Sequence, residues 1–248
     1  MGTPGDRSAS QTRNPGTLEV YLLGVVDFDA AVLLQKHVHS EIADRDDAQG
    51  TLLLCEHPPI VTVGRAGSRA DVLTDESELT SRRLEVRWLN RGGGCLVHGP
   101  GQLAVYPILP LDRLDCGLRD FRARLENAVL GCCREQHVPA WTYPDRPGVG
   151  CRSGQFAFVG AAVNSWVSYH GLFVNVAPRM DLMRLARSTP NGSRITSLAA
   201  QRRKPTPMHA VREALVRNLA EQFGYDDRHV YTGHPLLKRE RRRAHAYA

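Results

Sequence analysis

The segment from Arg91 to Gln102 reads Arg-Gly-Gly-Gly-Cys-Leu-Val-His-Gly-Pro-Gly-Gln, and its first eleven positions hold five glycines. A backbone without side chains can approach a bound molecule closely and point successive N–H groups at an oxyanion or a carbonyl. Arg91 and His98 are then the charged and titratable groups of the segment. No Gly-Lys-Ser/Thr ends it and no helix is expected after it, which excludes a Walker loop and a dinucleotide fingerprint. A binding loop and a plain connector between strands both remain open.

Apolar periodicity on either side of this segment predicts an α+β domain. Helices are expected from Asp27 to about Ala43, from Leu118 to about His137, and from Pro207 to Phe223 with Thr206 as N-cap and Gly224 as the stop. Apolar runs predict the strands 18–23, 51–55, 60–63, 102–109, 156–163, 166–169 and 172–176, whereas 141–149 reads as loop. Helices that flank runs of strands without regular βαβ alternation favour a single domain with a mixed or antiparallel sheet flanked by helices.

The 248 residues suffice for one domain of this size. We expect a flexible polar leader over 1–17, the folded domain over 18–237 and a basic tail over 238–248. The leader lacks the apolar core of a secretory signal, and no apolar run approaches the ~20 residues of a membrane span. The sequence therefore predicts a protein that does not enter membranes.

The charge and the cysteine content indicate which kinds of partner and which cellular compartment suit the protein. Lysine and arginine number 32 against 26 acidic residues, which favours acidic partners. The basic tail is expected to be a solvated end, and nucleic-acid binding is disfavoured because no groove-reading motif accompanies it. The six cysteines show no Cys-x-x-Cys spacing, so we expect reduced thiols in a cytoplasmic protein without a metal site.

A second motif, Ser168-Tyr169-His170-Gly171-Leu172, is followed by Val174-Asn175-Val176. It places a histidine between two predicted apolar strands, and a glycine follows that histidine in the sequence. His170 can be a packed, hydrogen-bonded side chain or a catalytic group.

Three strings, in this order, resemble the lipoyl(octanoyl) transferase family over about Leu18 to Phe223. They are Glu56-His57-Pro58-Pro59-Ile60-Val61-Thr62-Val63-Gly64-Arg65; then Arg91-Gly92-Gly93 and His98-Gly99-Pro100-Gly101-Gln102-Leu103 with Tyr106-Pro107-Ile108; then His170-Gly171-Leu172 with Asn175-Val176. The resemblance implies the α+β catalytic fold of biotin and lipoate protein ligases. It also implies transfer of an octanoyl group from acyl carrier protein to a lysine of a lipoyl domain, as in 2-oxoacid dehydrogenases or the glycine cleavage protein. The family does this through a cysteine thioester, without metal, ATP or another cofactor.

Carried over by position, the resemblance assigns an acyl-binding role to two groups of residues. The glycine-rich loop contributes Arg91, Gly92, Gly93, Gly94, Leu96 and Val97, with His98 and His170 at the polar end. The two strands contribute the triplets Phe158-Val159-Gly160 and Gly171-Leu172-Phe173, whose apolar character suits an eight-carbon chain.

Two positions depart from the family pattern. The turn that holds the nucleophilic cysteine of the family reads Thr189-Pro190-Asn191-Gly192 here, and Gln155 replaces the assisting lysine. No cysteine follows Cys151, and no lysine lies between Lys36 and Lys204. The same missing lysine argues against a ligase that uses ATP.

Three readings remain open. Cys95 could be a substitute nucleophile, its pKa lowered by His98 or His170, although a small residue filling a packed position is the favoured reading. The loop N–H groups could instead polarise a bound thioester while the acceptor lysine attacks it directly. In the third reading the protein is a catalytically silent relative that binds an acyl chain, acyl carrier protein or a lipoyl domain.

Overall fold

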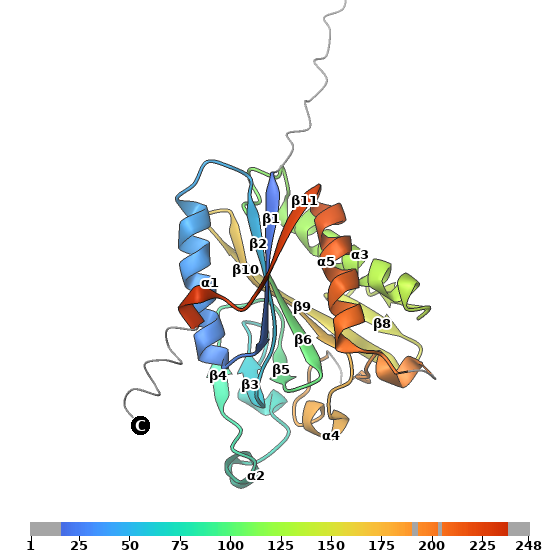
Figure 1. Cartoon of the computed structure of the whole chain (residues 1–248). Coiled ribbons are helices and arrows are strands. Elements are labelled where there is room, and N and C mark those ends of the chain that lie inside the picture. The colour runs from blue at the N-terminus through green and yellow to red at the C-terminus, as the bar shows by residue number, and fades with distance from the viewer. Residues whose placement is uncertain (1–15, 190–192, 203–204, 238–248) are drawn as a thin grey trace, which may run out of the picture.

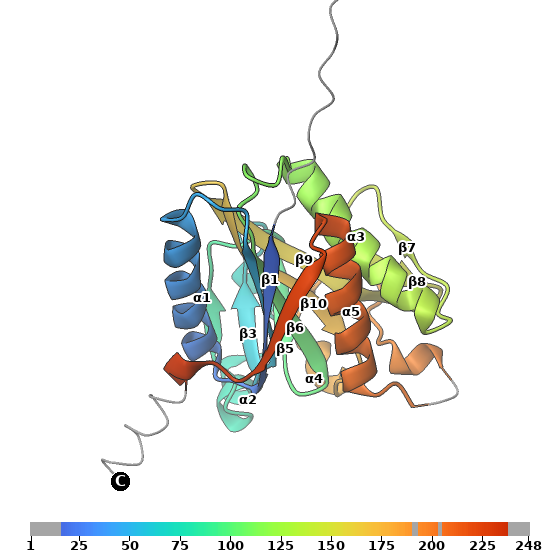
Figure 2. The same ribbon diagram turned by 45° about the horizontal axis from the view of Figure 1, so that its top comes forward.

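An eight-stranded sheet divides the domain into two layers of core (Figures 1 and 2). The computed structural model describes residues 16–189, 193–202 and 205–237. The strand order is β11-β1-β2-β6-β10-β9-β8-β7, and a second sheet has the order β4-β3-β5. β1 runs parallel to both β2 and β11, while β6, β10, β9, β8 and β7 follow antiparallel, so the sheet is mixed as expected.

The strands of the large sheet are β1 (Thr17–Val25), β2 (Gly50–Glu56), β6 (Gln102–Ile108), β7 (Trp141–Thr142), β8 (Gly148–Cys151), β9 (Gly154–Asn164), β10 (Val167–Asn175) and β11 (Asp227–Thr232). Those of the small sheet are β3 (Ile60–Val63), β4 (Val86–Trp88) and β5 (Cys95–His98). The helices are α1 (Phe28–Ala43), α2 (Glu76–Ser81), α3 (Leu118–Glu135), α4 (Met180–Met183) and α5 (Met208–Phe223), with short 3₁₀ turns at Arg69–Asp71 and Ala199–Gln201.

Helix α1 covers one face of the large sheet (Figure 1). Asp27 caps its first turn by accepting a hydrogen bond from the Ala30 N–H, as an N-cap side chain does. Its apolar stripe, which includes Ala31, Leu34 and Val38, packs against Leu53, Tyr106 and Phe173 of the sheet. This layer is called the α1 core below.

Helices α3 and α5 cover the opposite face and pack against each other (Figure 2). Helix α5 ends at Gly224, whose left-handed φ of 77° is typical of a helix C-cap. Its N-cap is Pro207, one residue beyond the expected Thr206, because helical geometry begins at Met208.

Several elements differ from the sequence expectation. The supposed loop 141–149 contains the short strand β7 and the start of β8, and β10 continues through Gly171 without a break. Trp166 lies in the turn before β10 rather than in a strand. β1 begins at Thr17, one residue inside the expected leader, whereas most of that leader and the basic tail 238–248 lie outside the described residues. No helix of the described part has both the length and the apolar character that a membrane crossing needs.

Candidate functional site

The glycine-rich loop lies against β9 and the end of β3. The Gly92 N–H donates to the Ala161 carbonyl at 2.9 Å, and the Gly94 carbonyl accepts from Gly64 at 3.1 Å. A Cβ atom on Gly64 would lie 2.5 Å from the Gly93 carbonyl oxygen, so only glycine permits this approach. Gly93 has a φ of 77°, and the structure gives the N–H groups of Gly93 and Gly94 no acceptor among the described residues. These donors remain available to a ligand.

The buried side chain of Arg91 holds the loop against β3. It is fully buried, and its guanidinium donates to the Gly92 carbonyl and to both oxygens of Thr62 at 2.7–3.0 Å. Burial lowers its pKa to about 10, so the group stays a cation at neutral pH. No carboxylate among the described residues pairs with it. An unneutralised positive charge therefore lies under the loop.

His98 belongs to a buried chain of hydrogen bonds. Nδ1 lies 2.7 Å from Gln102 Oε1, and Nε2 lies 2.8 Å from Thr62 Oγ1. Gln102 Nε2 donates to the Val97 carbonyl and to Asn175 Oδ1, so Oε1 is its acceptor and His98 Nδ1 carries the proton. His98 Nε2 then accepts from the Thr62 hydroxyl. Burial holds the pKa of His98 well below its usual range, which keeps the ring neutral.

The same chain reaches the segment that follows the family's cysteine turn. Asn175 Nδ2 donates to the Thr196 carbonyl at 3.1 Å, and the Thr196 N–H donates to the Gln155 carbonyl at 2.8 Å. The polar network thus runs from Arg91 to the strand end at Gln155. Thr62, Gln102, Asn175 and Thr196 had no predicted role. The available signal was the polarity of Thr62, Gln102 and Asn175 within apolar strands, whereas Thr196 lies outside the strands.

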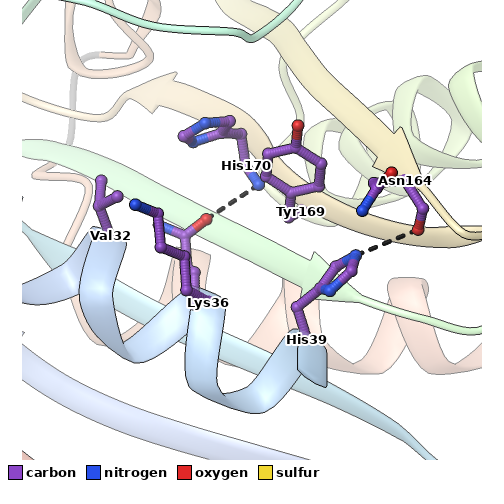
Figure 3. A pocket seen from close by; sticks show the side chains of 7 residues that line it. Val32, Lys36, His39, Asn164, Tyr169 and His170 are labelled. Carbon is purple, nitrogen blue, oxygen red and sulfur yellow. Dashed lines mark hydrogen bonds between the residues drawn. The ribbon is translucent and has the colours of Figure 1, made fainter. Parts of the chain in front are cut away.

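His170 lies in the first half of β10, beside α1. Its φ of 53° interrupts the alternation of the strand, and both His170 and its neighbour Tyr169 line a pocket of about 240 Å³ over α1. Figure 3 shows Lys36 and His39 of α1 beneath these two rings. The His170 backbone N–H donates to Gln35 Oε1 at 2.9 Å. Burial, reinforced by Arg91, lowers the pKa of His170 to about 4.

Cys95 does not share a face with His98. Alternation along β5 directs Cys95 and Val97 into a cluster with Val61 and Val63, whereas Leu96 packs in the α1 core. Cys95 is fully buried, and burial raises its pKa to about 11. The expectation that a histidine lowers this pKa is wrong, because desolvation outweighs the favourable effect of Arg91. The thiol stays protonated at neutral pH, which disfavours a nucleophilic role.

The two apolar triplets divide between the faces of the sheet. Phe158 and Phe173 are direct partners across β9 and β10 and lie in the α1 core with Leu96. Gly160 pairs with Gly171, and a Cβ on Gly160 would lie 3.1 Å from the Gly92 carbonyl oxygen. Val159 and Leu172 point to the α3 and α5 side. The members of the set that lie on the α1 side of the sheet are therefore Leu96, Phe158 and Phe173, with Gly160 and Gly171 covered by the Gly92 carbonyl and by Pro107.

Gln155 is buried at the start of β9, and Asn191 lies outside the described residues. The Gln155 Nε2 donates to the carbonyls of Pro147 and Ala157 at 3.1 and 3.0 Å. Its Oε1 is buried without a partner in the described part. A carboxamide cannot serve as a base at neutral pH, so Gln155 holds this strand end together without supplying proton transfer.

Comparison with known proteins agrees with the sequence resemblance. The family model of the lipoyl protein ligase A/B catalytic domain matches residues 27–220. An octanoyltransferase of Geotalea uraniireducens is 37% identical over 182 residues, which are 72% of this chain and 80% of that protein. An octanoyltransferase of Geobacter metallireducens is 35% identical over 206 residues, covering 82% and 90% of the two chains.

Solved structures support the fold. A lipoate-protein ligase A bound with ATP superimposes with a TM-score of 0.69 at 16% identity, covering 90% of this chain and 92% of that one. A bipartite lipoate protein ligase from Thermoplasma acidophilum gives 0.69 at 15% identity, covering 90% of each chain. The chain therefore belongs to the lipoyl(octanoyl) transferase family and has the lipoate-protein ligase fold.

Proposed function

We propose that the protein transfers an octanoyl group from octanoyl-acyl carrier protein to a lysine of a lipoyl domain, in the cytoplasm and without a metal or other cofactor. The observation that carries this proposal is the loop at Gly93 and Gly94, whose N–H groups have no acceptor among the described residues and which lies against β9 and the buried Arg91 cation. The relatives reported above are named octanoyltransferases. They give no support to the alternative of a silent binding protein.

The acyl chain would lie in a chamber formed by Leu96, Phe158 and Phe173. These residues belong to the α1 core or pair directly within it. Burying apolar chain there contributes about 0.8 kcal/mol per methylene. His98 and His170, both held neutral, would shape the polar parts of this chamber without adding charge.

The chemistry fits direct attack by the acceptor better than a nucleophile at Cys95. The acceptor amine would form a bond to the thioester carbonyl carbon, and the carbon–sulfur bond would break after loss of an amine proton. The carrier thiol leaves with a proton, and an amide remains. Loop N–H groups and the Arg91 charge would stabilise the oxyanion that forms on the way, a contribution of about 2.7–4 kcal/mol per donor in known oxyanion holes.

The test combines the purified protein with octanoyl-acyl carrier protein and an unmodified lipoyl domain, and reads both proteins by intact-mass spectrometry. We expect an octanoylated acceptor, no adduct on this protein, and unchanged turnover in Cys95→Ala. Gly93→Ala should lower the rate, since alanine is strained at a φ of 77°. Gly117→Ala is the matched control, because Gly117 has an ordinary φ of −70°.

An octanoyl adduct that is lost in Cys95→Ser would contradict direct attack and would indicate covalent catalysis through the Cys95 thiol. An acceptor that stays unmodified at every enzyme concentration, with the acyl carrier protein still bound, would refute transferase activity.

A further inference from the structure

A second hollow lies beside the segment that pairs with Gln155 through Ile195. It has a volume of about 460 Å³ and, among the residues that the structure describes, is lined by three arginines (Arg184, Arg187 and Arg194) and five residues with hydroxyl groups, but by no acidic residue. Such a lining suits a partner that is acidic and rich in hydrogen-bonding groups.

This hollow adjoins the polar network of the candidate site. The Gln155 N–H donates to the Arg194 carbonyl at 2.9 Å, and Thr196, which lines the hollow, donates its N–H back to Gln155. Thr196 also accepts from Asn175, the last amide of the chain that begins at Arg91. A molecule in the hollow would therefore end at the same strand end that the family uses for its chemistry.

Hydrogen bonds hold the backbone near these arginines in place. The Arg187 N–H donates to the Asp71 carbonyl at 2.7 Å, and the Leu73 N–H donates to the Leu185 carbonyl at 2.8 Å. Arg187 also has an exposed ion pair with Asp71 at 3.8 Å. Arg184 and Arg194 have no carboxylate partner among the described residues. Their charges remain available to a partner.

We propose that this arginine-lined hollow is the docking site of the acyl carrier protein, which enters it with its prosthetic arm while its acidic surface meets Arg184 and Arg194. The proposal rests on the proposed function for the identity of the partner. The acceptor is the poorer fit, because its lysine is a cation and Arg184 and Arg194, which have no carboxylate partner among the described residues, repel it. The hydroxyl groups match the amide and hydroxyl groups of the pantetheine arm.

The test is the double variant Arg184→Glu/Arg194→Glu, measured for binding to fluorescently labelled octanoyl-acyl carrier protein by anisotropy. We expect the Kd to rise roughly tenfold or more and its salt dependence to become weaker, as for the loss of steering charges at an interface rim. Transfer from octanoyl-pantetheine, which lacks the carrier, should keep its KM within about twofold. Arg228→Glu, an exposed arginine beside a different hollow at β11, is the matched control and should bind the carrier as the unaltered protein does.

Unchanged carrier binding in the double variant would overturn the proposal, as would an equal loss in Arg228→Glu. A rise in the KM for the lipoyl domain with unchanged carrier affinity would assign the hollow to the acceptor and also overturn it. Carrier binding that depends on the two arginines without octanoylation of any acceptor would support the docking site and refute the transferase.

Discussion

At the scale of single residues, Thr62 holds two motifs together. Its hydroxyl accepts from Arg91 and lies 2.8 Å from His98 Nε2, so it links the buried cation to the histidine. Thr62→Val preserves the shape but leaves both partners without their bond in a buried site. We expect the free energy of unfolding to fall by about 1–3 kcal/mol and transfer to slow. Urea denaturation checks the stability, Thr62→Ser should restore it, and a Thr62→Val variant as stable as the unaltered protein would contradict the network.

Gln155 and Asn191 make the family resemblance testable at two positions. The carbonyls of Pro147 and Ala157, which now accept from Gln155, could equally accept from a lysine ammonium. We predict that Gln155→Lys/Asn191→Cys gains an octanoyl thioester on residue 191 when mixed with octanoyl-acyl carrier protein, visible by intact mass and removed by hydroxylamine. Asn191→Cys alone should label more slowly. A double variant that never labels would show that the two positions do not form the family's catalytic pair in this chain.

At the scale of elements, the contact between α3 and α5 depends on Gly131. A Cβ there would lie 1.7 Å from Asn218 Oδ1, and Asn218 donates to Glu135 and to the Ala214 carbonyl. Gly131→Ala must displace this amide, which we expect to cost about 1–3 kcal/mol of unfolding free energy. Asn218→Ala makes room for the added Cβ. The double variant should therefore lose less unfolding free energy than the sum of the losses in the two single variants. Strict additivity in urea unfolding would argue against the clash.

The sequence predicted long periodic elements better than short ones. α1, α3 and α5 carry apolar stripes and end signals that act locally, and their bounds differ from expectation by a few residues. β11 was missed because all six of its residues are exposed and carry no alternation of burial. In the site, motifs identified Arg91, His98 and His170. The opposed directions of Cys95 and His98 follow from their odd spacing within β5, and they were not predicted because this segment was read as part of a glycine-rich loop and not as a strand.

At the scale of the whole molecule, the buried histidines His57, His98 and His170 couple stability to pH. Burial lowers the pKa of His57 and of His170 to about 4 and that of His98 well below its usual value, against roughly 6.5 in an unfolded chain. Between those values the unfolded chain binds protons that the folded protein excludes. The free energy of unfolding is therefore greatest above about pH 6.5 and decreases as the pH falls towards 4, by on the order of 3 kcal/mol at most for each of His57 and His170.

His57 allows this coupling to be measured separately. Its Nδ1 donates to the Val26 carbonyl at 2.8 Å, and its Nε2 accepts from the Tyr106 hydroxyl at 2.6 Å, so a proton added at Nε2 breaks a buried bond. We expect His57→Asn to lose stability at neutral pH and to show a shallower decline between pH 6.5 and 4.5 in urea unfolding. His37→Asn, at an exposed position on α1, should keep the original slope. An unchanged slope in His57→Asn would mean that the acid sensitivity of the fold arises from other groups.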